Sequence, residues 1–286
     1  MKIALGTAQF GMDYGISNLK GQTSFDEVKK IIEFSRNIGI KKIDTAKNYG
    51  ETEKIIGEVG IKDFKIITKL PKISSNELNP IFFVDNQIQD SMTKMKISKI
   101  DTLLLHNARD LLSASGKKIY YKILELKKVG VIDKFGISVY EKDEIDQLHK
   151  NFNFDVIQIP FNIFDTRLIK VGYLKELKKK GVEIHARSIF LQGLLLMKRN
   201  SLPLKFLKWK KVWNEWFIWF KKNPNISQME LCLSYALSIK EIDTLIIGVN
   251  NIQQLNELNE IAKKPLKDNF PQFNIEDKNL LNPTNW

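Results

Sequence analysis

Short apolar runs alternate along the chain with longer stretches in which apolar residues recur every three to four positions. A short apolar run bounded by Gly or Pro is typical of a buried strand, and the wider spacing is typical of an amphipathic helix. The runs predict strands at 2–7, 41–44, 64–69, 100–105, 134–138, 155–159, 182–187 and 244–247. The wider spacing predicts a helix between a Thr23 or Ser24 cap and Gly39, and further helices at 53–59, 80–96, 117–129, 142–150, 168–180, 204–222, 227–239 and 253–263.

The order of these elements indicates the fold class. Regular alternation of strand and helix implies a parallel sheet, and eight repeats indicate an α/β protein with a closed (β/α)8 TIM barrel. We therefore expect a single domain over residues 1–286, in which 264–286 form an irregular C-terminal strap that contains three prolines. An open, doubly wound sheet is the alternative, but no strand runs into a G-x-G-x-x-G turn.

The charge pattern argues against a nucleic-acid partner. The chain has 286 residues, with 45 Lys+Arg against 33 Asp+Glu and a formal net charge of +12. Arginine, which reads phosphates and bases with two donors at once, is scarce and occurs at Arg36, Arg109, Arg167, Arg187 and Arg199. The lysines are spread along the predicted helices, as is usual for a solvated surface. An anionic small-molecule substrate remains compatible with this charge.

Cysteine usage and hydropathy bear on metal binding, disulfides and cellular location. The single cysteine, Cys232, excludes an internal disulfide and a Cys-based zinc site, and no metal site is predicted. Gly6, Thr7 and Gln9 interrupt the first apolar run at once, which is unlike a signal peptide. No apolar stretch approaches the roughly 18 residues of a membrane span. We expect a soluble, cytoplasmic protein, and the sequence indicates no oligomeric state.

Polar residues of four types lie at or just beyond three consecutive predicted strands. Asp44 ends the second strand, Lys69 ends the third, and His106 follows the fourth, while Tyr49 lies in the loop after the second strand. The C-terminal ends of barrel strands meet at one mouth, where barrels place their chemistry. Each residue alone has an ordinary structural explanation, but their coincidence predicts an active site.

These side chains suit proton transfer to a carbonyl oxygen. Tyrosine has an ordinary pKa of about 10, and a neighbouring ammonium is expected to lower it. In this hypothesis Asp44 holds Lys69, and His106 hydrogen-bonds the substrate oxygen or assists the proton transfer. Apart from Lys69, none of these side chains is a good nucleophile towards carbon. The electron pair that reduces the carbonyl therefore has to come from outside the set, and the hydride of a nicotinamide cofactor is the economical source.

Motifs along the chain resemble the aldo-keto reductase family. They run in family order from about residue 2 to about residue 258, and comprise Gly6-Thr7-Ala8-Gln9-Phe10-Gly11, Asp44-Thr45-Ala46 with Tyr49-Gly50, Thr68-Lys69, Ile100 to His106, Phe135-Gly136-Ile137-Ser138, Gln158 to Asn162 and Gln192-Gly193-Leu194-Leu195. The resemblance implies that Tyr49 is the general acid, that Lys69 and Asp44 tune it, and that His106 orients the substrate. It also implies an extended nicotinamide cofactor, with contacts from Gly6, Thr7, Asp44, Ser138, Gln158, Arg187, Gly248, Asn250 and Gln254, of which Ser138 and Gln158 would hold the carboxamide.

Two departures from the family pattern bear on the cofactor. Arg187 stands where many members stack an aromatic ring on the nicotinamide, so it could contact the cofactor or an acidic substrate instead. No basic residue stands in 246–251, where members often bind the adenosine 2′-phosphate, although Lys263 or Lys264 could compensate. The family's usual preference favours NADP(H), and NAD(H) is the alternative.

The expected activity is NAD(P)(H)-dependent reduction of an aldehyde or ketone, with a sugar-derived or acidic carbonyl compound as a possible substrate. A rival hypothesis keeps the barrel and uses Lys69 as a Schiff-base nucleophile in an aldolase-type site. A third is a cofactor-binding regulatory protein that interacts through the basic, Trp-rich stretch at 206–220. The ordinary interpretation of that stretch is a barrel helix with its apolar face packed inward.

Overall fold

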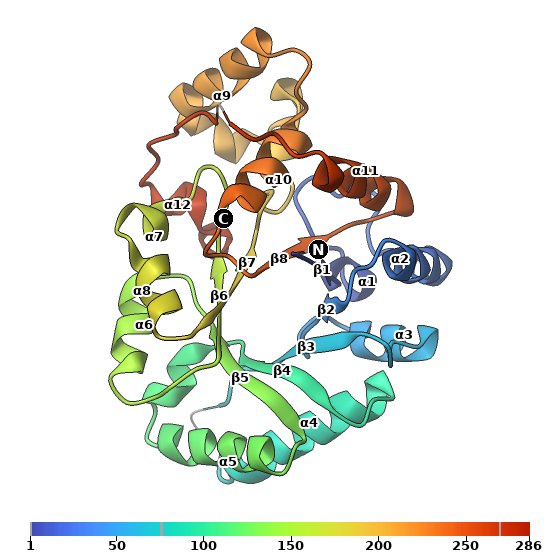
Figure 1. Cartoon of the computed structure of the whole chain (residues 1–286), viewed down its shortest axis with the longest axis vertical. Helices are drawn as coiled ribbons and strands as arrows, with labels where there is room; N and C mark the ends of the chain where they lie inside the picture. Colours follow the sequence, from blue (N-terminus) through green and yellow to red (C-terminus); the bar gives the residue numbers. More distant parts are fainter. Residues whose placement is uncertain (1, 75–76, 269) are drawn as a thin grey trace.

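The computed structural model describes residues 2–74, 77–268 and 270–286. Within these ranges, eight parallel strands close into a barrel in which each strand pairs with its neighbours in the chain and the last pairs with the first (Figure 1). The strands are β1 (Ile3–Gly6), β2 (Lys42–Asp44), β3 (Lys65–Leu70), β4 (Ile100–Leu105), β5 (Ile132–Ser138), β6 (Val156–Pro160), β7 (Glu183–Arg187) and β8 (Thr244–Gly248). The predicted single-domain (β/α)8 barrel is confirmed.

Helices surround the barrel and shield its outer face (Figure 1). They are α1 (Ala8–Gly11), α2 (Phe25–Asn37), α3 (Thr52–Val59), α4 (Pro80–Met95), α5 (Gly116–Lys128), α6 (Lys142–His149), α7 (Arg167–Lys170), α8 (Tyr173–Lys179), α9 (Lys210–Lys222), α10 (Gln228–Ser238), α11 (Ile252–Lys263) and α12 (Lys278–Leu281). Helix α2 shows how the sequence builds them: the Ser24 hydroxyl caps its first turn by accepting from the Glu27 amide. Its Val28, Ile31 and Ile32 are fully buried on the face that packs inward.

The register of the strands fixes which side chains face the barrel interior. Asp44 on β2 and Gln158 on β6 are hydrogen-bonded across the barrel, so both point inside. Residues paired in register share a face, and the pairs Gly6↔Asp44, Gly6↔Gly248 and Gln158↔His185 therefore line the interior. A separate apolar cluster of buried side chains fills the interior between them, consisting of Ala4, Ile67, Leu104, Val156 and Ile246.

Three helical predictions need correction. The helix predicted at 168–180 is two helices, α7 and α8, because Gly172 between them takes a left-handed conformation with φ of 70°. The helix predicted at 204–222 begins as a 3₁₀ helix, Leu204–Trp209, before α9. The short helix α1 follows β1, where the sequence analysis predicts no helix.

The Trp-rich segment at 206–220 buries two of its tryptophans, Trp213 and Trp216, in the protein. Trp216 is fully buried and contacts Phe164 and Phe273, with ring centroids 5.1 and 5.5 Å away. Trp213 is also buried, and its indole N–H donates to the Phe206 carbonyl oxygen at 2.8 Å. Phe273 belongs to the segment after α11, so this segment and α9 bury one another's aromatic rings. None of the helices in the described ranges is long and apolar enough to cross a membrane.

Candidate active site

A buried ion pair stands at the C-terminal end of the barrel. Asp44 is the last residue of β2 and Lys69 the last but one of β3, and their strand ends meet at the same mouth. Lys69 Nζ lies 2.6 Å from Asp44 Oδ1, with the two side chains 1% and 3% exposed. The Lys69 ammonium also donates to the Thr45 carbonyl oxygen at 2.9 Å, and the Gln158 amide donates to Asp44 Oδ2 at 2.8 Å. Both carboxylate oxygens are thus bonded, which holds the pair in one geometry.

Tyr49 and His106 lie beside this pair. Their rings meet edge-on, with centroids 5.9 Å apart and planes inclined at 83°. Lys69 Nζ lies 5.2 Å from the centre of the Tyr49 ring. The structure therefore brings together the four residues that the sequence analysis predicts as catalytic, although they come from two strands and two loops.

The loop that carries Tyr49 is braced from two sides. The Thr52 hydroxyl, at the start of α3, donates to the Tyr49 carbonyl oxygen at 2.6 Å. A Cβ added at Gly11 would overlap that same carbonyl oxygen, and one added at Gly50 would overlap the Gly11 carbonyl oxygen. The turn around Tyr49 thus sits directly on α1, and only glycine fits at Gly11 without moving it.

A buried carboxylate anchors the far end of this loop. Glu53 accepts hydrogen bonds from Thr68 at 2.8 Å and from Ser91 at 3.0 Å, which ties α3 to β3 and α4. Lys47 lies 3.6 Å from the same carboxylate and also pairs with Asp90. Lys47 therefore anchors the outer side of the loop through these two carboxylates.

The electrostatics of Tyr49 contradict one prediction. Burial, followed by the Asp44 carboxylate, raises the pKa of Tyr49 above its ordinary value, and Arg187 offsets this only in part. The expected lowering of this pKa by a neighbouring cation fails because burial of the phenol, the largest cause, together with the Asp44 carboxylate, favours the protonated form. Tyr49 is consequently a protonated donor at neutral pH.

Burial also sets the charge of the other two groups. It lowers the pKa of Lys69, against the opposing pull of Asp44. Burial, together with the charges of Lys69 and Arg187, lowers the pKa of His106 to about 4, so the ring is neutral at pH 7. His106 Nδ1 is buried without a hydrogen-bond partner in the described parts of the chain. A neutral imidazole of this kind offers one donor and one acceptor to a substrate oxygen.

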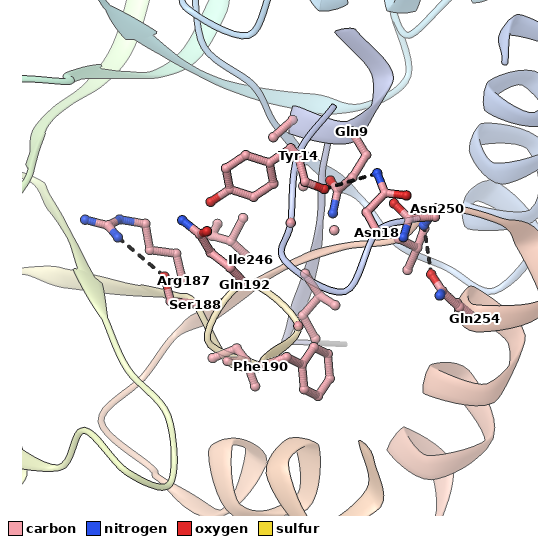
Figure 2. A pocket seen from close by; sticks show the side chains of 18 of the residues that line it. Gln9, Tyr14, Asn18, Arg187, Ser188, Phe190, Gln192, Ile246, Asn250 and Gln254 are labelled. Atoms are coloured by element: carbon pink, nitrogen blue, oxygen red, sulfur yellow. Dashed lines mark hydrogen bonds between the residues drawn. The ribbon is translucent and has the colours of Figure 1, made fainter. Parts of the chain in front are cut away.

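A pocket of about 990 Å³, continuous with solvent, opens over Asp44 and Tyr49. Three segments form its walls: the end of β1 with the loop after it, the loop after β7, and the end of β8 with the start of α11 (Figure 2). The two loops meet above it, since the Ile16 amide donates to the Gln192 carbonyl oxygen at 2.9 Å. Arg187 lies on one side of this groove, and Asn250 and Gln254 lie on the opposite side (Figure 2).

The residues predicted to bind the cofactor fall into two groups. Most line the pocket, namely Gly6, Thr7, Asp44, Arg187, Gly248, Asn250 and Gln254. Ser138 and Gln158 do not line it and are buried deeper in the barrel, where Gln158 donates to Asp44. Gln158 Oε1 and Asn250 Oδ1 are buried acceptors that bond to nothing in the described residues.

Several pocket residues escaped the sequence analysis. Tyr14 and Asn18 come from the loop after α1, and Ser188, Phe190 and Gln192 from the loop after β7 (Figure 2). Burial raises the pKa of Tyr14 to about 12. The one signal in the sequence was the aromatic Tyr14 between Gly11 and Gly15. In the loop after β7 the sequence analysis noted the Gln192-Gly193 motif but gave it no role in a pocket. The left-handed backbone at Ser188, Leu191 and Gln192 could not be predicted, because it occurs at residues other than glycine.

The described residues contain no metal-binding cluster. Across residues 2–74, 77–268 and 270–286, no set of three or more His, Cys, Asp and Glu side chains is arranged to hold a metal ion. Cys232 is a buried free thiol within α10.

Comparison with known proteins places the sequence in a family. A model described as the aldo/keto reductase family matches residues 2–272. The uncharacterized oxidoreductase YqkF of Bacillus subtilis is 24% identical over 276 residues, which cover 90% of this chain and 89% of that protein. The oxidoreductase sirO of Leptosphaeria maculans is 27% identical over 220 residues, covering 72% of this chain and 65% of that one.

Solved structures show the same fold. The holo form of the aldo-keto reductase AKR11C1 from Bacillus halodurans superposes with a TM-score of 0.73 at 20% identity, covering 93% of this chain and 88% of that one. The glycerol dehydrogenase AKR11B4 from Gluconobacter oxydans gives a TM-score of 0.71, also at 20% identity and with the same coverage of both chains. With a family model matched over nearly its whole length, and with its closed barrel, this chain belongs to the aldo/keto reductase family.

Proposed function

We propose that this oxidoreductase reduces an aldehyde or ketone with a nicotinamide cofactor, and that Tyr49 is the general acid. The observation that carries the proposal is the buried Asp44–Lys69 pair directly beside Tyr49 and His106, with Asp44 and Tyr49 in the lining of an open pocket. A protonated phenol and a neutral imidazole can both hydrogen-bond a carbonyl oxygen that enters this pocket.

The groove has donors and acceptors that fit an extended nicotinamide cofactor. Gln158 Oε1, which is buried in the barrel outside the pocket lining, is an acceptor without a partner in the described residues and would suit the N–H₂ group of a carboxamide that reached it. Asn250 Oδ1, at the other end of the groove, suits a ribose hydroxyl. Gly6 and Gly248 pair in register on the pocket wall, where the Gln9 side chain packs against Gly248. When bound, such a cofactor supplies the hydride.

The identity of the cofactor follows the family's usual preference, so we favour NADP(H) over NAD(H). At the far end of the groove the side chains that line it are the amides of Asn250 and Gln254. The Gln254 amide oxygen accepts from the Asn250 backbone N–H at 2.8 Å, which fixes the turn there. Amides can bond either a phosphate or a hydroxyl, so the choice between the two cofactors rests on a measurement.

The chain's own residues would move one proton in each turnover. As the substrate carbonyl is reduced, its oxygen gains negative charge and takes the Tyr49 hydroxyl proton, which completes the alcohol. Burial has raised the pKa of Tyr49, so the phenol holds its proton until a strong base, the nascent alkoxide, takes it. The resulting phenolate lies within the field of Arg187, whose positive charge partly stabilises it.

The Schiff-base hypothesis has one observation in its favour, the lowered pKa of Lys69. Against it, the ammonium is 1% exposed and is bonded to Asp44 and to the Thr45 carbonyl oxygen. Borohydride reduction in the presence of a carbonyl substrate would trap a covalent adduct on Lys69 if this chemistry occurred. We expect no adduct.

The direct test of the proposed function is fluorescence titration of the protein with NADPH and with NADH, followed by turnover against a panel of aldehydes, ketones and sugars. We expect binding of at least one cofactor and oxidation of the bound reduced form by at least one carbonyl class. Cofactor binding without turnover of any panel member would favour a regulatory role. Absence of binding would refute the proposal. The cytoplasmic location stays a prediction.

A further inference from the structure

Arg187 is a pocket cation without a carboxylate partner. Other arginines of the chain are paired: Arg36 with Asp63 at 2.8 Å, and Arg167 with Asp165 at 2.8 Å. In the part of the chain that the structure describes, the Arg187 guanidinium bonds only the Val139 carbonyl oxygen at 3.3 Å and, at the 3.5 Å limit, Ser188 Oγ. Most of its five donors are therefore free.

The guanidinium is nevertheless held in place. Its central carbon lies 4.2 Å from the centre of the Tyr140 ring, in a stacked cation–π contact. Ser188, the next residue, takes a left-handed backbone with φ of 63°. Its carbonyl oxygen accepts from the amide of the buried Asn162 at 3.3 Å. A strained turn maintained by a buried hydrogen bond is typical of a functional position.

The charges around the pocket leave this cation uncompensated. Asp44 is the single acidic side chain among the described residues that line the pocket, and it is already paired with Lys69. His106 contributes no charge at neutral pH. The floor of the pocket thus carries one net positive charge, on Arg187. An unpaired charge in a partly buried site is costly, and an oxyanion would remove that cost.

Arg187 and Tyr49 line the same pocket, so one small molecule can reach both. The planar guanidinium presents parallel N–H groups that match two oxygens of a carboxylate or a phosphate. Tyr140 covers one face of the Arg187 guanidinium. We therefore expect an anion to bind the N–H groups along the edge of the guanidinium.

We propose that Arg187 binds a carboxylate or phosphate group of the carbonyl substrate, so that this enzyme acts on anionic aldehydes or ketones. The inference rests on the proposed function, because it names the substrate class of the same site. It assigns the guanidinium to the substrate and not to the cofactor.

The kinetic test uses matched substrate pairs. Succinic semialdehyde is compared with butanal, and glyceraldehyde 3-phosphate with glyceraldehyde, for the wild type, Arg187→Gln and Arg187→Lys. The wild type is expected to prefer the anionic member, and Arg187→Gln to lower the ratio of kcat/KM within a pair by about 10- to 100-fold, the range of a charge-assisted hydrogen bond. Arg187→Lys keeps the charge without the fork and should give an intermediate ratio.

The control is Arg199→Gln, because Arg199 bonds Asn214 and lies over Phe217 outside the pocket. It should leave the ratio unchanged. An unchanged ratio in Arg187→Gln would overturn the proposal. So would an equal loss for both members of each pair with a matching loss of NADPH or NADH affinity, since the guanidinium would then serve the cofactor.

Calorimetric titration of the cofactor-free protein with succinate and with inorganic phosphate separates this inference from the proposed function. If the wild type turns over no carbonyl compound, the proposed function fails, but binding of either anion that weakens at least tenfold in Arg187→Gln would still support the anion site. Absence of anion binding by the wild type in that case would overturn the inference as well.

Discussion

The most informative residue is His106, because its charge state decides how it can act. Burial and two neighbouring cations lower its pKa to about 4, so at neutral pH the imidazole offers a hydrogen bond and no proton. The sequence could place His106 after a strand, since an apolar run ends there, and could pair Asp44 with Lys69 by their strand-end positions. It could not give the sign of the Tyr49 pKa shift, because that depends mainly on how deeply the folded chain buries the phenol.

The depressed pKa of His106 predicts a pH dependence of stability. In the unfolded chain the ring titrates near its ordinary value of about 6.5, so between pH 6.5 and 4 the unfolded state binds more protons than the folded state. The free energy of unfolding should therefore fall as the pH is lowered through this window.

Urea unfolding of the wild type and of His106→Gln between pH 7 and pH 4 measures this contribution. The variant should lose less stability over the window, while the buried His185, whose pKa is also lowered, contributes equally to both proteins. Equal losses in the two proteins would show that His106 is not buried in its neutral form.

Among the elements, the turn after β2 matters most, because it carries Tyr49. Its position depends on Gly11 in α1, on Thr52 in α3 and on the buried Glu53. The sequence predicted the strands closely, since a short group of apolar residues marks each of them, and missed α1 because four residues give no periodicity. The break between α7 and α8 was missed because Gly172 lies within a stretch that keeps the apolar spacing of a single helix. The left-handed turn at Ser188 could not be predicted from the sequence, because such turns are usually indicated by a glycine and none stands at this position.

Gly11→Ala is expected to impair catalysis by shifting the turn. The added methyl group would overlap the Tyr49 carbonyl oxygen and would crowd the Thr52 hydroxyl that donates to it. Displacement of a catalytic group by about 1 Å can cost on the order of 100-fold in rate, so kcat should fall strongly with little change in cofactor affinity.

Gly130→Ala is the matched control for this substitution. Gly130 has a positive φ, which Gly11 lacks, but open space surrounds its Cβ position, and it follows α5 away from the mouth. This variant should lose some thermal stability and keep its kcat. If Gly11→Ala also kept its kcat, the bracing of Tyr49 by α1 would be wrong.

At the scale of the whole molecule, the closed barrel gathers side chains from distant parts of the sequence at one mouth. Alternation of strands and helices predicted this arrangement, and with it the meeting of Asp44, Lys69 and His106. The walls of the pocket could not be predicted in the same way. They come from loops whose contacts, such as Ile16 with Gln192, join segments that no periodic pattern relates. The Trp-rich segment likewise needed the structure to show which rings face inward.

Trp216→Ala should destabilise the whole protein. The ring is fully buried against Phe164, Phe220 and Phe273, and loss of a buried aromatic side chain costs about 3–5 kcal/mol. Urea unfolding measures the change. Ile218→Ala, at a side chain 50% exposed on the same helix, is the control and should change the free energy of unfolding little. Similar small effects from both would mean that α9 is a loosely attached surface element.

The most direct test of the account is the Tyr49→Phe variant, which removes one hydroxyl and keeps the ring that contacts His106. Its cofactor dissociation constant, measured by fluorescence titration, is compared with its single-turnover rate of carbonyl reduction. We predict a dissociation constant close to that of the wild type, with turnover abolished. Reduction at a rate near that of the wild type would contradict the assignment of Tyr49 as the proton donor.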